Sequence, residues 1–388
     1  MTAFQDMKDR KLKTRPKNHT THRIFVAGTR MNDGKTTTCL GLFAALQQKY
    51  SKVGFIKPVG QRFVKIDGQL IDEDSILLEK TYNVETPISS MSPIAIDGSF
   101  TKRYLDDPEK MGADLTDKVC NAFDRASWEK NFTLIEGSGH AGVGSVFELS
   151  NARVAKLLGA KAIIVSRGGI GQPIDEIALN KALFDQEGVE VVGAIINKVE
   201  ADKMDMIRKY TSLALKRLGI PLLGLLPSEK VLTSPNLEQI RERVNGTPLN
   251  RVDEIRPRRF SQIVIGAMTV TSFLDTVSPD TLLITPGDRE DIVLAVLSHE
   301  SHHTSGTISC IILTRGIRPS PALLERIGKS RIPFISVSTD SYTVASQIHS
   351  MTVKTQPGDD DKIPLIKKII QENIDLNQII DAFTLIED

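Results

Sequence analysis

The sequence predicts an α/β fold, with a parallel sheet that helices cover on both faces, followed by a second, smaller α/β domain. Short uninterrupted apolar runs alternate with helix-like stretches, as strands buried on both faces do. A glycine-bearing loop separates the first apolar run from a helix-like segment, an arrangement typical of α/β ligand sites. The alternation lapses in a charged, proline-bearing stretch near residue 250 and then resumes.

Length and composition fit a globular protein of more than one domain. The chain has 388 residues, of which 40% are apolar and 25% are charged. Its formal net charge of +1 provides no overall field for nucleic acid or an anionic membrane. No apolar run reaches the roughly 18 residues of a membrane span. We therefore expect neither nucleic acid nor membrane as a partner, and a cytoplasmic location.

The cysteines and the N-terminal residues add two expectations. Cys39, Cys120 and Cys310 lie far apart and form no metal or redox spacing, which suits a reducing compartment. Residues 1–22 are polar and rich in lysine and arginine, but they include acidic residues that a transit peptide would lack. We expect residues 1–22 to form a disordered basic tail.

Ten apolar runs predict the strands of two domains. In the first domain, at 23–245, they lie at 24–28, 52–58, 132–137, 161–166, 191–198 and 221–227. In the second, at 246–388, they lie at 262–268, 281–287, 308–316 and 332–338. Residues 363–383 have apolar positions at helical spacing and predict a terminal helix, which we assign to the second domain.

The loop that follows the first strand predicts a phosphate site. Its backbone N–H groups and the N-terminus of the next helix would converge on an anion. Lys35 can reach the outer phosphates and the Thr36 hydroxyl can ligate Mg²⁺. A glycine turn with an exposed lysine is the simpler alternative. The residues expected to contact nucleotide here are Gly28, Asn32, Asp33, Gly34, Lys35, Thr36 and Thr37.

The spacing of this loop differs from the common P-loop and resembles one family. Five residues separate Gly28 from Gly34 in "GTRMNDGKT", whereas the common pattern has four. The stretch resembles the long phosphate loop of dethiobiotin synthetase and its relatives. Further similar motifs follow in the same order over about residues 23–235: "GFIKPVG" with Lys57, "LIEGSGH" with Glu136, "GAIINK" with Asn197, and the closing strand "GIPLLGLLP".

The second domain resembles the DRTGG domain, which is named for its D-R and T-G-G residues. Asp288, Arg289, Thr314 and Gly316 match that signature, and Arg315 stands where it has glycine. In long bacterial phosphate acetyltransferases such a domain follows a dethiobiotin-synthetase-like module, in the N-terminal regulatory half. The acetyltransferase domain itself is not recognisable in this chain. The resemblance thus implies a regulatory half that stands alone, with a partner acetyltransferase and no acetyltransferase activity of its own.

Three further residues of the resemblance gain support from their expected positions. Glu136 ends an apolar strand beside glycines and can hold Mg²⁺ opposite Thr36; a surface acid is the alternative. Lys57 should emerge at the carboxyl edge of the sheet, where ligands collect, or else lie in solvent. The amide of Asn197 can donate to and accept from adenine, or serve a turn.

Asp74, in "DEDSILLEK", is a further candidate. Its carboxylate could be a second magnesium ligand or simply a helix N-cap. The two roles are compatible.

Two functions stay open for the first domain, both with ATP and Mg²⁺ as cofactors. One is a nucleotide-dependent regulator or sensor. The other is an ATP-dependent synthetase or amide ligase, in which Lys35 and Lys57 are the catalytic residues that neutralise charge on phosphate and transferred group. The stretches "KPVGQRF" and "GHAGVGS" depart from dethiobiotin synthetase, which argues against that enzyme's own substrate.

Assembly and the second domain give two more expectations. Relatives of this P-loop class commonly dimerise, so we expect a homodimer. Arg30 precedes Lys35 by five residues, where some relatives carry a lysine that reaches the partner's phosphates; a solvated arginine is the alternative. Arg289, Arg315 and Arg318 follow two strand ends and could bind a small anion together, unless Arg289 pairs with Glu290 or Asp291.

Overall fold

The computed structural model describes residues 15–251, 255, 258–302 and 308–384. The chain forms two compact units. Unit 1 comprises the chain up to Glu229 together with Thr355 onward, and unit 2 comprises Lys230–Lys354. Unit 2 is therefore an insertion in unit 1, between two of its elements. No helix in the described ranges combines the length and the apolarity that crossing a bilayer requires.

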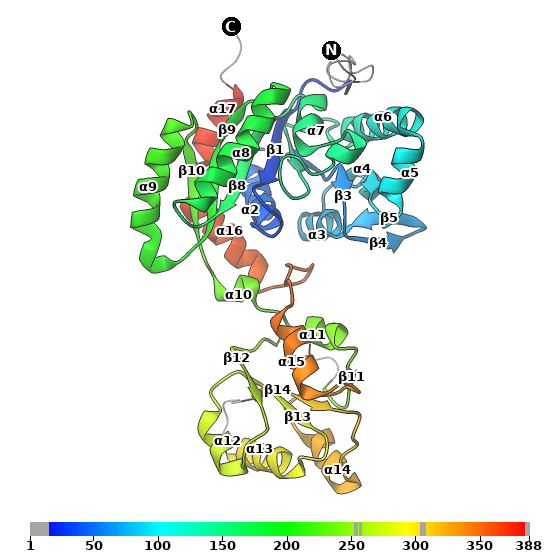
Figure 1. Ribbon diagram of the computed structural model, residues 1–388, viewed down its shortest axis with the longest axis vertical. Coiled ribbons are helices and arrows are strands. Elements are labelled where there is room, and N and C mark those ends of the chain that lie inside the picture. The colour runs from blue at the N-terminus through cyan, green and yellow to red at the C-terminus, as the bar shows by residue number, and fades with distance from the viewer. Residues whose placement is uncertain (1–14, 252–254, 256–257, 303–307, 385–388) are drawn as a thin grey trace. The chain divides into compact units, whose positions relative to one another are not determined.

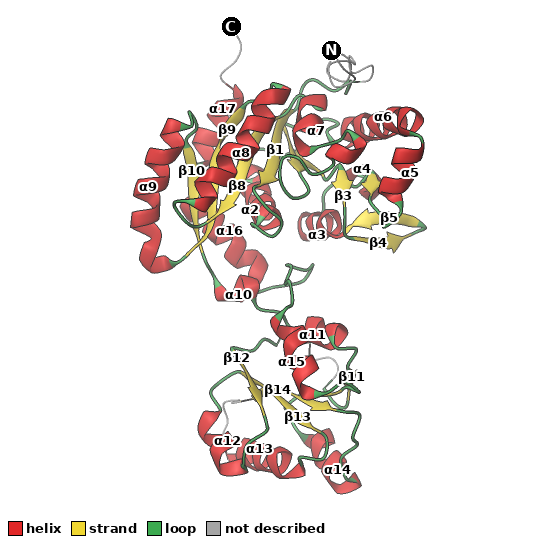
Figure 2. Ribbon diagram, in the orientation of Figure 1, coloured by secondary structure: helices red, strands yellow, loops and turns green. Residues whose placement is uncertain are grey.

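Unit 1 is built on a six-stranded sheet in which every strand pair is parallel (Figure 2). The spatial order is β10-β9-β8-β1-β7-β2. These strands are β1 (His22–Gly28), β2 (Val53–Ile56), β7 (Phe132–Glu136), β8 (Lys161–Arg167), β9 (Val191–Val199) and β10 (Leu222–Pro227). All six coincide with predicted runs. Because the strands are parallel, their carboxyl ends meet at one edge of the sheet.

Helices cover both faces of this sheet (Figure 1). One face packs its alternate residues, among them Phe25 and Ile164, into a single core with α6 (Pro108–Ala126), α7 (Asn151–Leu157), α8 (Gln172–Glu187) and α9 (Met204–Arg217). On the opposite face lie α2 (Lys35–Gln47) and α16 (Lys362–Asn373), which pack against each other. Helix α2 is apolar nearly all round, as expected for a helix buried between a sheet and a second helix.

Small elements lie between β2 and β7, and of these the sequence indicated only a helix that begins near Asp74. They are the pair β3 (Val59–Gly60) and β6 (Ile94–Ala95), the hairpin β4 (Phe63–Ile66) and β5 (Gln69–Asp72), and the helices α3 (Glu73–Tyr82), α4 (Ile88–Met91) and α5 (Phe100–Asp106). Strand pairs of two to four residues carry too little periodicity to be recognised. They place Asp72 and Asp74 beside the carboxyl edge of the main sheet.

The C-terminal segment differs from the prediction, which assigned 246–388 to the second domain. Residues after Lys354 belong to unit 1. Helix α16 packs on α2 so closely that a Cβ on Gly41 would lie 2.0 Å from Ile370 Cγ1. Ile374 then bridges to Gly224 of β10, and α17 (Leu376–Thr384) follows. The periodicity shows that this segment has an apolar face, but not which surface that face covers.

The N-terminal prediction falls partly outside the described residues, since these begin at residue 15. Residues 15–21 differ from the predicted disordered tail, because they are fixed against α6. The N–H groups of Lys17 and Asn18 both donate to the carboxylate of Asp124, and the side chain of Asn18 donates to the Ser127 carbonyl. Residues 15–21 are polar in composition, but hydrogen bonds to the protein hold them in place.

Unit 2 has a five-stranded mixed sheet of order β11-β15-β14-β13-β12. The four predicted strands are present as β12 (Gln262–Ile265), β13 (Thr281–Pro286), β14 (Ile308–Thr314) and β15 (Phe334–Ser336), mutually parallel, and β11 (Thr247–Pro248) adds an antiparallel edge. The helices are α10 (Lys230–Thr233), α11 (Leu237–Arg243), α12 (Val270–Thr276), α13 (Glu290–His302), α14 (Pro321–Lys329) and α15 (Ser341–His349).

The boundary at 245/246 also differs, because unit 2 already begins at Lys230. The charged stretch after Pro235 contains α11, which opens with a capping box between Asn236 and Gln239. Leu237 and Ile240 of this helix pack into the core formed by β13, β14 and β15. The charged residues between Leu237 and Arg243 thus lie on an amphipathic helix rather than in a linker.

Candidate functional site

The loop between β1 and α2 has the geometry of an anion site. Asn32 and Gly34 have left-handed backbones, with φ of 65° and 99°. In the described part of the chain, the backbone N–H groups from Met31 to Thr37 donate to no acceptor. The last three belong to the first turn of α2, where the positive end of the helix dipole lies. Successive free N–H groups of this kind form a cradle for phosphate oxygens.

Two glycines of the loop have no room for a side chain. A Cβ on Gly28 would lie 2.8 Å from the Arg30 carbonyl oxygen and 2.9 Å from Lys35 Nζ. A Cβ on Gly34 would lie 1.9 Å from Asn197 Nδ2, in a backbone conformation that already favours glycine. The predicted glycine positions are therefore required by the packing of the loop.

Two charged side chains complete the loop from inside. Lys35 is buried, and its Nζ donates to the Arg30 carbonyl at 3.2 Å. Burial lowers the pKa of Lys35, and the nearby Lys57 lowers it further, so this ammonium gains from an anionic ligand. Asp33 is fully buried; its carboxylate accepts from the Thr29 hydroxyl at 2.8 Å and from the Arg30 N–H at 2.7 Å. Asp33 thus shapes the loop rather than facing a ligand.

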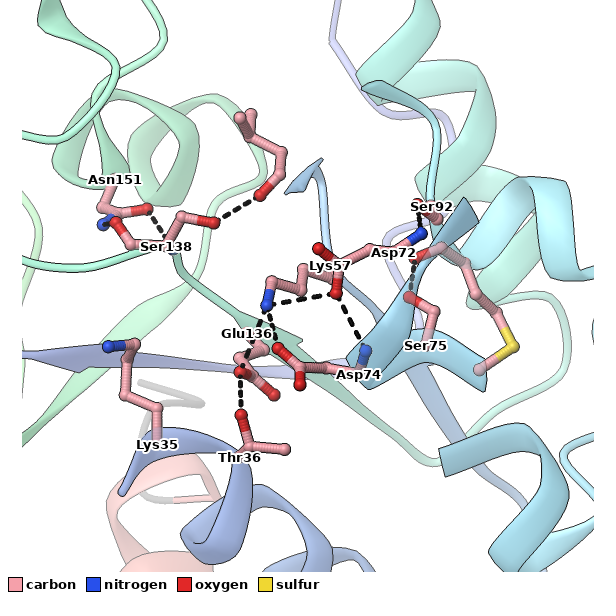
Figure 3. Close-up of polar contacts among 12 residues, drawn as sticks. Lys35, Thr36, Lys57, Asp72, Asp74, Ser75, Ser92, Glu136, Ser138 and Asn151 are labelled. Carbon is pink, nitrogen blue, oxygen red and sulfur yellow. Dashed lines mark hydrogen bonds and ion pairs between the residues drawn. The ribbon is translucent and has the colours of Figure 1, made fainter. Parts of the chain in front are cut away.

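Glu136 and Thr36 meet as the magnesium prediction requires. Glu136 ends β7, and its Oε1 accepts from Thr36 Oγ1 at 2.8 Å (Figure 3). Its other oxygen, Oε2, is buried and has no hydrogen-bond partner among the described residues. Burial raises the pKa of Glu136 to about 7, against the opposing effect of Lys57. A buried carboxylate oxygen of this kind beside a threonine hydroxyl fits a Mg²⁺ ion, which prefers oxygen ligands.

Lys57 joins this carboxylate to two others. Its Nζ forms an ion pair with Asp74, lies 3.2 Å from Asp72 Oδ1 and 3.6 Å from Glu136 Oε1 (Figure 3). Burial alone would lower the pKa of Lys57, but the three carboxylates raise it well above its usual range. The four side chains, here called the Lys57 cluster, are all buried. Lys57 directly follows β2 at the carboxyl edge of the sheet, and only the alternative of a solvated lysine differs from these contacts.

Asp72 is the member of the Lys57 cluster that sequence reasoning missed. It caps α3, because its carboxylate accepts from the Asp74 N–H at 2.9 Å, so the predicted capping role belongs to Asp72 and not to Asp74. The signal was present in "IDEDS", where the first acid directly precedes the helix. Asp74 lies in the first turn of α3, and Lys57 pairs with both Asp74 and Glu136.

Asn197 lies at the end of β9, next to the phosphate loop. Its Nδ2 donates to the Asp33 carbonyl at 2.9 Å, and its Oδ1 accepts from the Lys198 N–H at 2.8 Å. Both ends of the amide are therefore engaged with the protein. The side chain supports the loop through one N–H and one acceptor position of its amide, and its contact with adenine stays a prediction.

Two other polar side chains near the site have internal partners. Arg30 is half exposed and forms an ion pair with Glu176 of α8, and its cross-subunit role stays a prediction. Asn151, which the sequence did not single out, donates to the carbonyls of Ser138 and His140 and accepts from the Ser138 N–H. It fixes the glycine-rich loop that follows Glu136. This role of Asn151 depends on contacts with a loop that forms only on folding, so no local sequence motif could predict it.

In unit 2, Arg289 is engaged with other groups of the protein and does not join Arg315 and Arg318 in a shared anion site. Its guanidinium donates to the carbonyls of Gly266 and Met268 at 3.1 and 2.7 Å and pairs with Asp291. The alternative pairing with Asp291 is therefore present. Arg315 and Arg318 are exposed beyond β14, and Arg315 has a left-handed backbone with φ of 67°. They are the predicted residues of this group that remain accessible to an anion.

The three cysteines and the possible metal ligands show the following arrangement. Cys39, Cys120 and Cys310 are buried free thiols, as their spacing indicated. Within the described ranges, no group of three or more histidine, cysteine or acidic side chains is arranged to hold a metal ion. Of the three predicted magnesium ligands, Thr36 and Glu136 contact each other, and Asp74 pairs with Lys57.

Curated relatives align with nearly the whole chain. Phosphate acetyltransferase of Nitratidesulfovibrio vulgaris is 26% identical over 377 residues, which cover 92% of this chain and 51% of the relative. That of Pseudomonas putida is 27% identical over 364 residues, covering 91% and 50%. The chain spans about half the length of the curated relatives it matches.

Solved structures resemble parts of the chain more distantly. The MinC:MinD cell division complex of Aquifex aeolicus matches 55% of this chain and 84% of its own, at 15% identity and a TM-score of 0.35. The CBS and DRTGG domains of the regulatory region of Clostridium perfringens pyrophosphatase, complexed with the activator diadenosine tetraphosphate, match 37% and 61%, at 23% identity and a TM-score of 0.26. Both likenesses are weak in sequence and in superposition.

Two family models match the chain. One described as an AAA domain (AAA_26) matches residues 22–236, and one described as a DRTGG domain matches residues 239–351. The first covers β1, the phosphate loop, Glu136 and Asn197, and it spans more than half of the 388 residues. The chain therefore belongs to the AAA_26 family of AAA domains, which is followed here by a DRTGG domain.

Proposed function

We propose that unit 1 binds Mg-ATP and acts as a nucleotide-dependent regulator or sensor. The observation that carries this proposal is the cradle of N–H groups from Met31 to Thr37, with Lys35 inside it and the Thr36–Glu136 pair beside it. The N–H groups would bind phosphate oxygens, and Lys35 would neutralise their charge. Thr36 and Glu136 would hold the magnesium ion, which adds positive charge between the phosphates.

The Lys57 cluster favours the sensor over the ligase. A ligase would need the Lys57 ammonium to stabilise charge on a transferred group. Here that ammonium is held by three carboxylates in a buried position. The ligase is the second candidate and requires Lys57 to leave this cluster. Product analysis separates the two, since a ligase must couple ATP cleavage to a substrate, whereas a sensor binds ATP with little turnover.

The relatives suggest what would be regulated. They are phosphate acetyltransferases, and this chain matches about half of each. We propose that the chain acts on an acetyltransferase partner in response to nucleotide. Unit 2 would contribute a small anionic ligand site that uses Arg315 and Arg318, with nucleotides and acyl phosphates as the first probes.

Replacing Lys35 tests the nucleotide site. Lys35→Ala removes a buried charge-assisted contact, which is worth roughly 1.5–3 kcal/mol, so Mg-ATP affinity should fall by about one to two orders of magnitude. Isothermal titration calorimetry measures it, with Lys80→Ala as the control, because Lys80 is an exposed lysine on α3. Equal affinity of Lys35→Ala and the parent would refute the assignment of the site.

Assembly is tested separately. We expect a homodimer, in which case light scattering should give about twice the mass of a single chain at micromolar concentration. The proposed cross-subunit role of Arg30 further requires that it exchange Glu176 for the partner's phosphates, so Arg30→Ala should weaken ATP-dependent dimerisation only. A single-chain mass with and without Mg-ATP would contradict both expectations.

A further inference from the structure

Two successive side chains at the end of β9 hold two successive carbonyls of the phosphate loop. Asn197 Nδ2 donates to the Asp33 carbonyl at 2.9 Å, and Lys198 Nζ donates to the Asn32 carbonyl at 2.7 Å. The Lys198 N–H in turn donates to Asn197 Oδ1 at 2.8 Å. Lys198 has a left-handed backbone with φ of 58°, which is uncommon for a residue with a side chain.

The direction of these carbonyls fixes the direction of the neighbouring N–H groups. A trans peptide is planar, and its N–H points opposite to its C=O. Holding the Asn32 carbonyl toward β9 therefore turns the Asp33 N–H away from β9. Holding the Asp33 carbonyl does the same for the Gly34 N–H. Both N–H groups belong to the set that has no acceptor in the described part of the chain.

We propose that Asn197 and Lys198 are positioning residues that keep the phosphate loop in its anion-binding conformation before any anion arrives. This inference rests on the proposed nucleotide site. Free carbonyls and N–H groups in a loop can exchange places by a peptide flip, and a flipped peptide would present oxygen to a phosphate. The two side chains oppose such flips at adjacent peptides. Asn197 acts on the loop through one of its two amide N–H groups, which donates to the Asp33 carbonyl.

The surroundings of both side chains restrict them to this role. Asn197 is buried, and Gly34 leaves no space between its α-carbon and Asn197 Nδ2. Lys198 is half-buried, and burial together with the nearby Arg167 lowers its pKa, so its ammonium is stabilised by the carbonyl that it meets. Lys35 acts in the same way from inside the loop, through the Arg30 carbonyl. Three peptides of the loop are thus oriented by side chains.

A ligand without a base separates this role from base recognition. Mg-ATP and inorganic tripolyphosphate with Mg²⁺ are titrated calorimetrically into the full chain and into Asn197→Ala and Lys198→Met. Each variant removes one hydrogen bond to the loop, and we expect each to weaken both ligands by a similar factor of about ten. Lys198→Arg keeps a donor and should restore most of the affinity. Lys203→Met is the matched control, because Lys203 is an exposed lysine shortly after β9 that pairs with Glu200.

Each outcome supports or overturns the proposal. Asn197→Ala that weakens ATP but leaves tripolyphosphate unchanged would show that Asn197 reads the base. Lys198→Met that binds tripolyphosphate like the parent would overturn the positioning role even if Asn197→Ala failed to fold, which thermal unfolding reveals. A parent chain that binds neither ligand would instead refute the proposed function, independently of these variants.

Discussion

A chain that ends at Lys354 is expected to lose the stable fold of unit 1. It would lack α16, which packs on α2 and β10, and α17, whose Phe383 lies against Phe132 of β7. The buried apolar side chains removed include Ile366, Ile369, Ile370, Ile374, Ile379 and Ile380. Losing one such side chain costs roughly 2–5 kcal/mol, and a domain is stable by only about 5–15 kcal/mol. Limited proteolysis with mapping of the cuts should show cleavage within the six strands of unit 1.

A single substitution in the full chain should cause a smaller, measurable loss of the same stability. Ile370→Ala should lower the free energy of unfolding by about 2–5 kcal/mol, because it opens a cavity between α16 and α2. Lys368→Ala is the control on the same helix, since Lys368 is exposed. A shortened chain that resists protease in β1, β7 and β8 as the parent does would contradict the expectation. It would mean that unit 1 does not need its last two helices.

This segment also shows what the sequence could and could not predict of the fold. The ten apolar runs were confirmed as strands. They could be predicted because a strand buried on both faces is a short uninterrupted apolar run, which is visible in the sequence itself. The helical periodicity of 363–383 was equally legible. The prediction assigned this helix to the second domain, whereas it packs in unit 1. The periodicity of a sequence shows that one face of a helix is apolar, but not which surface that face covers. The partner surface on α2, around Gly41, lies more than 300 residues earlier in the chain.

The same limit separates the predicted from the unpredicted parts of the site. The loop from Gly28 to Thr36 and the strand end at Glu136 were located from motifs whose chemistry is local. The partners of Lys57 and Asn197 were not, since Asp72 sits in a hairpin with almost no periodicity and the Asp33 carbonyl is a backbone group. Local motifs thus identify the groups that are proposed to bind a ligand, whereas the side chains that hold these groups in place depend on tertiary contacts.

Replacing Lys57 is the second change with a large expected effect. Lys57→Met keeps most of the side-chain volume but leaves Asp72, Asp74 and Glu136 without their shared cation. Removing one partner of a buried ionic group typically costs about 3–5 kcal/mol, because the remaining charge stays desolvated. Urea unfolding at about pH 8 should show a loss of this size. Lys65→Met, at an exposed lysine of β4, should have little effect.

The pH dependence of this loss tests its electrostatic origin. In the parent, burial already raises the pKa of Glu136 to about 7, above the value of an unfolded chain, and removing the ammonium should raise it further. A group with a raised folded pKa binds more protons in the folded state, so its contribution to stability is complete below the unfolded pKa and is lost as pH rises through the folded value. The deficit of Lys57→Met relative to the parent should therefore shrink as pH falls from about 8 to about 5. A deficit that stays constant over this range would mean that Lys57 contributes through packing, and that the carboxylates do not depend on its charge.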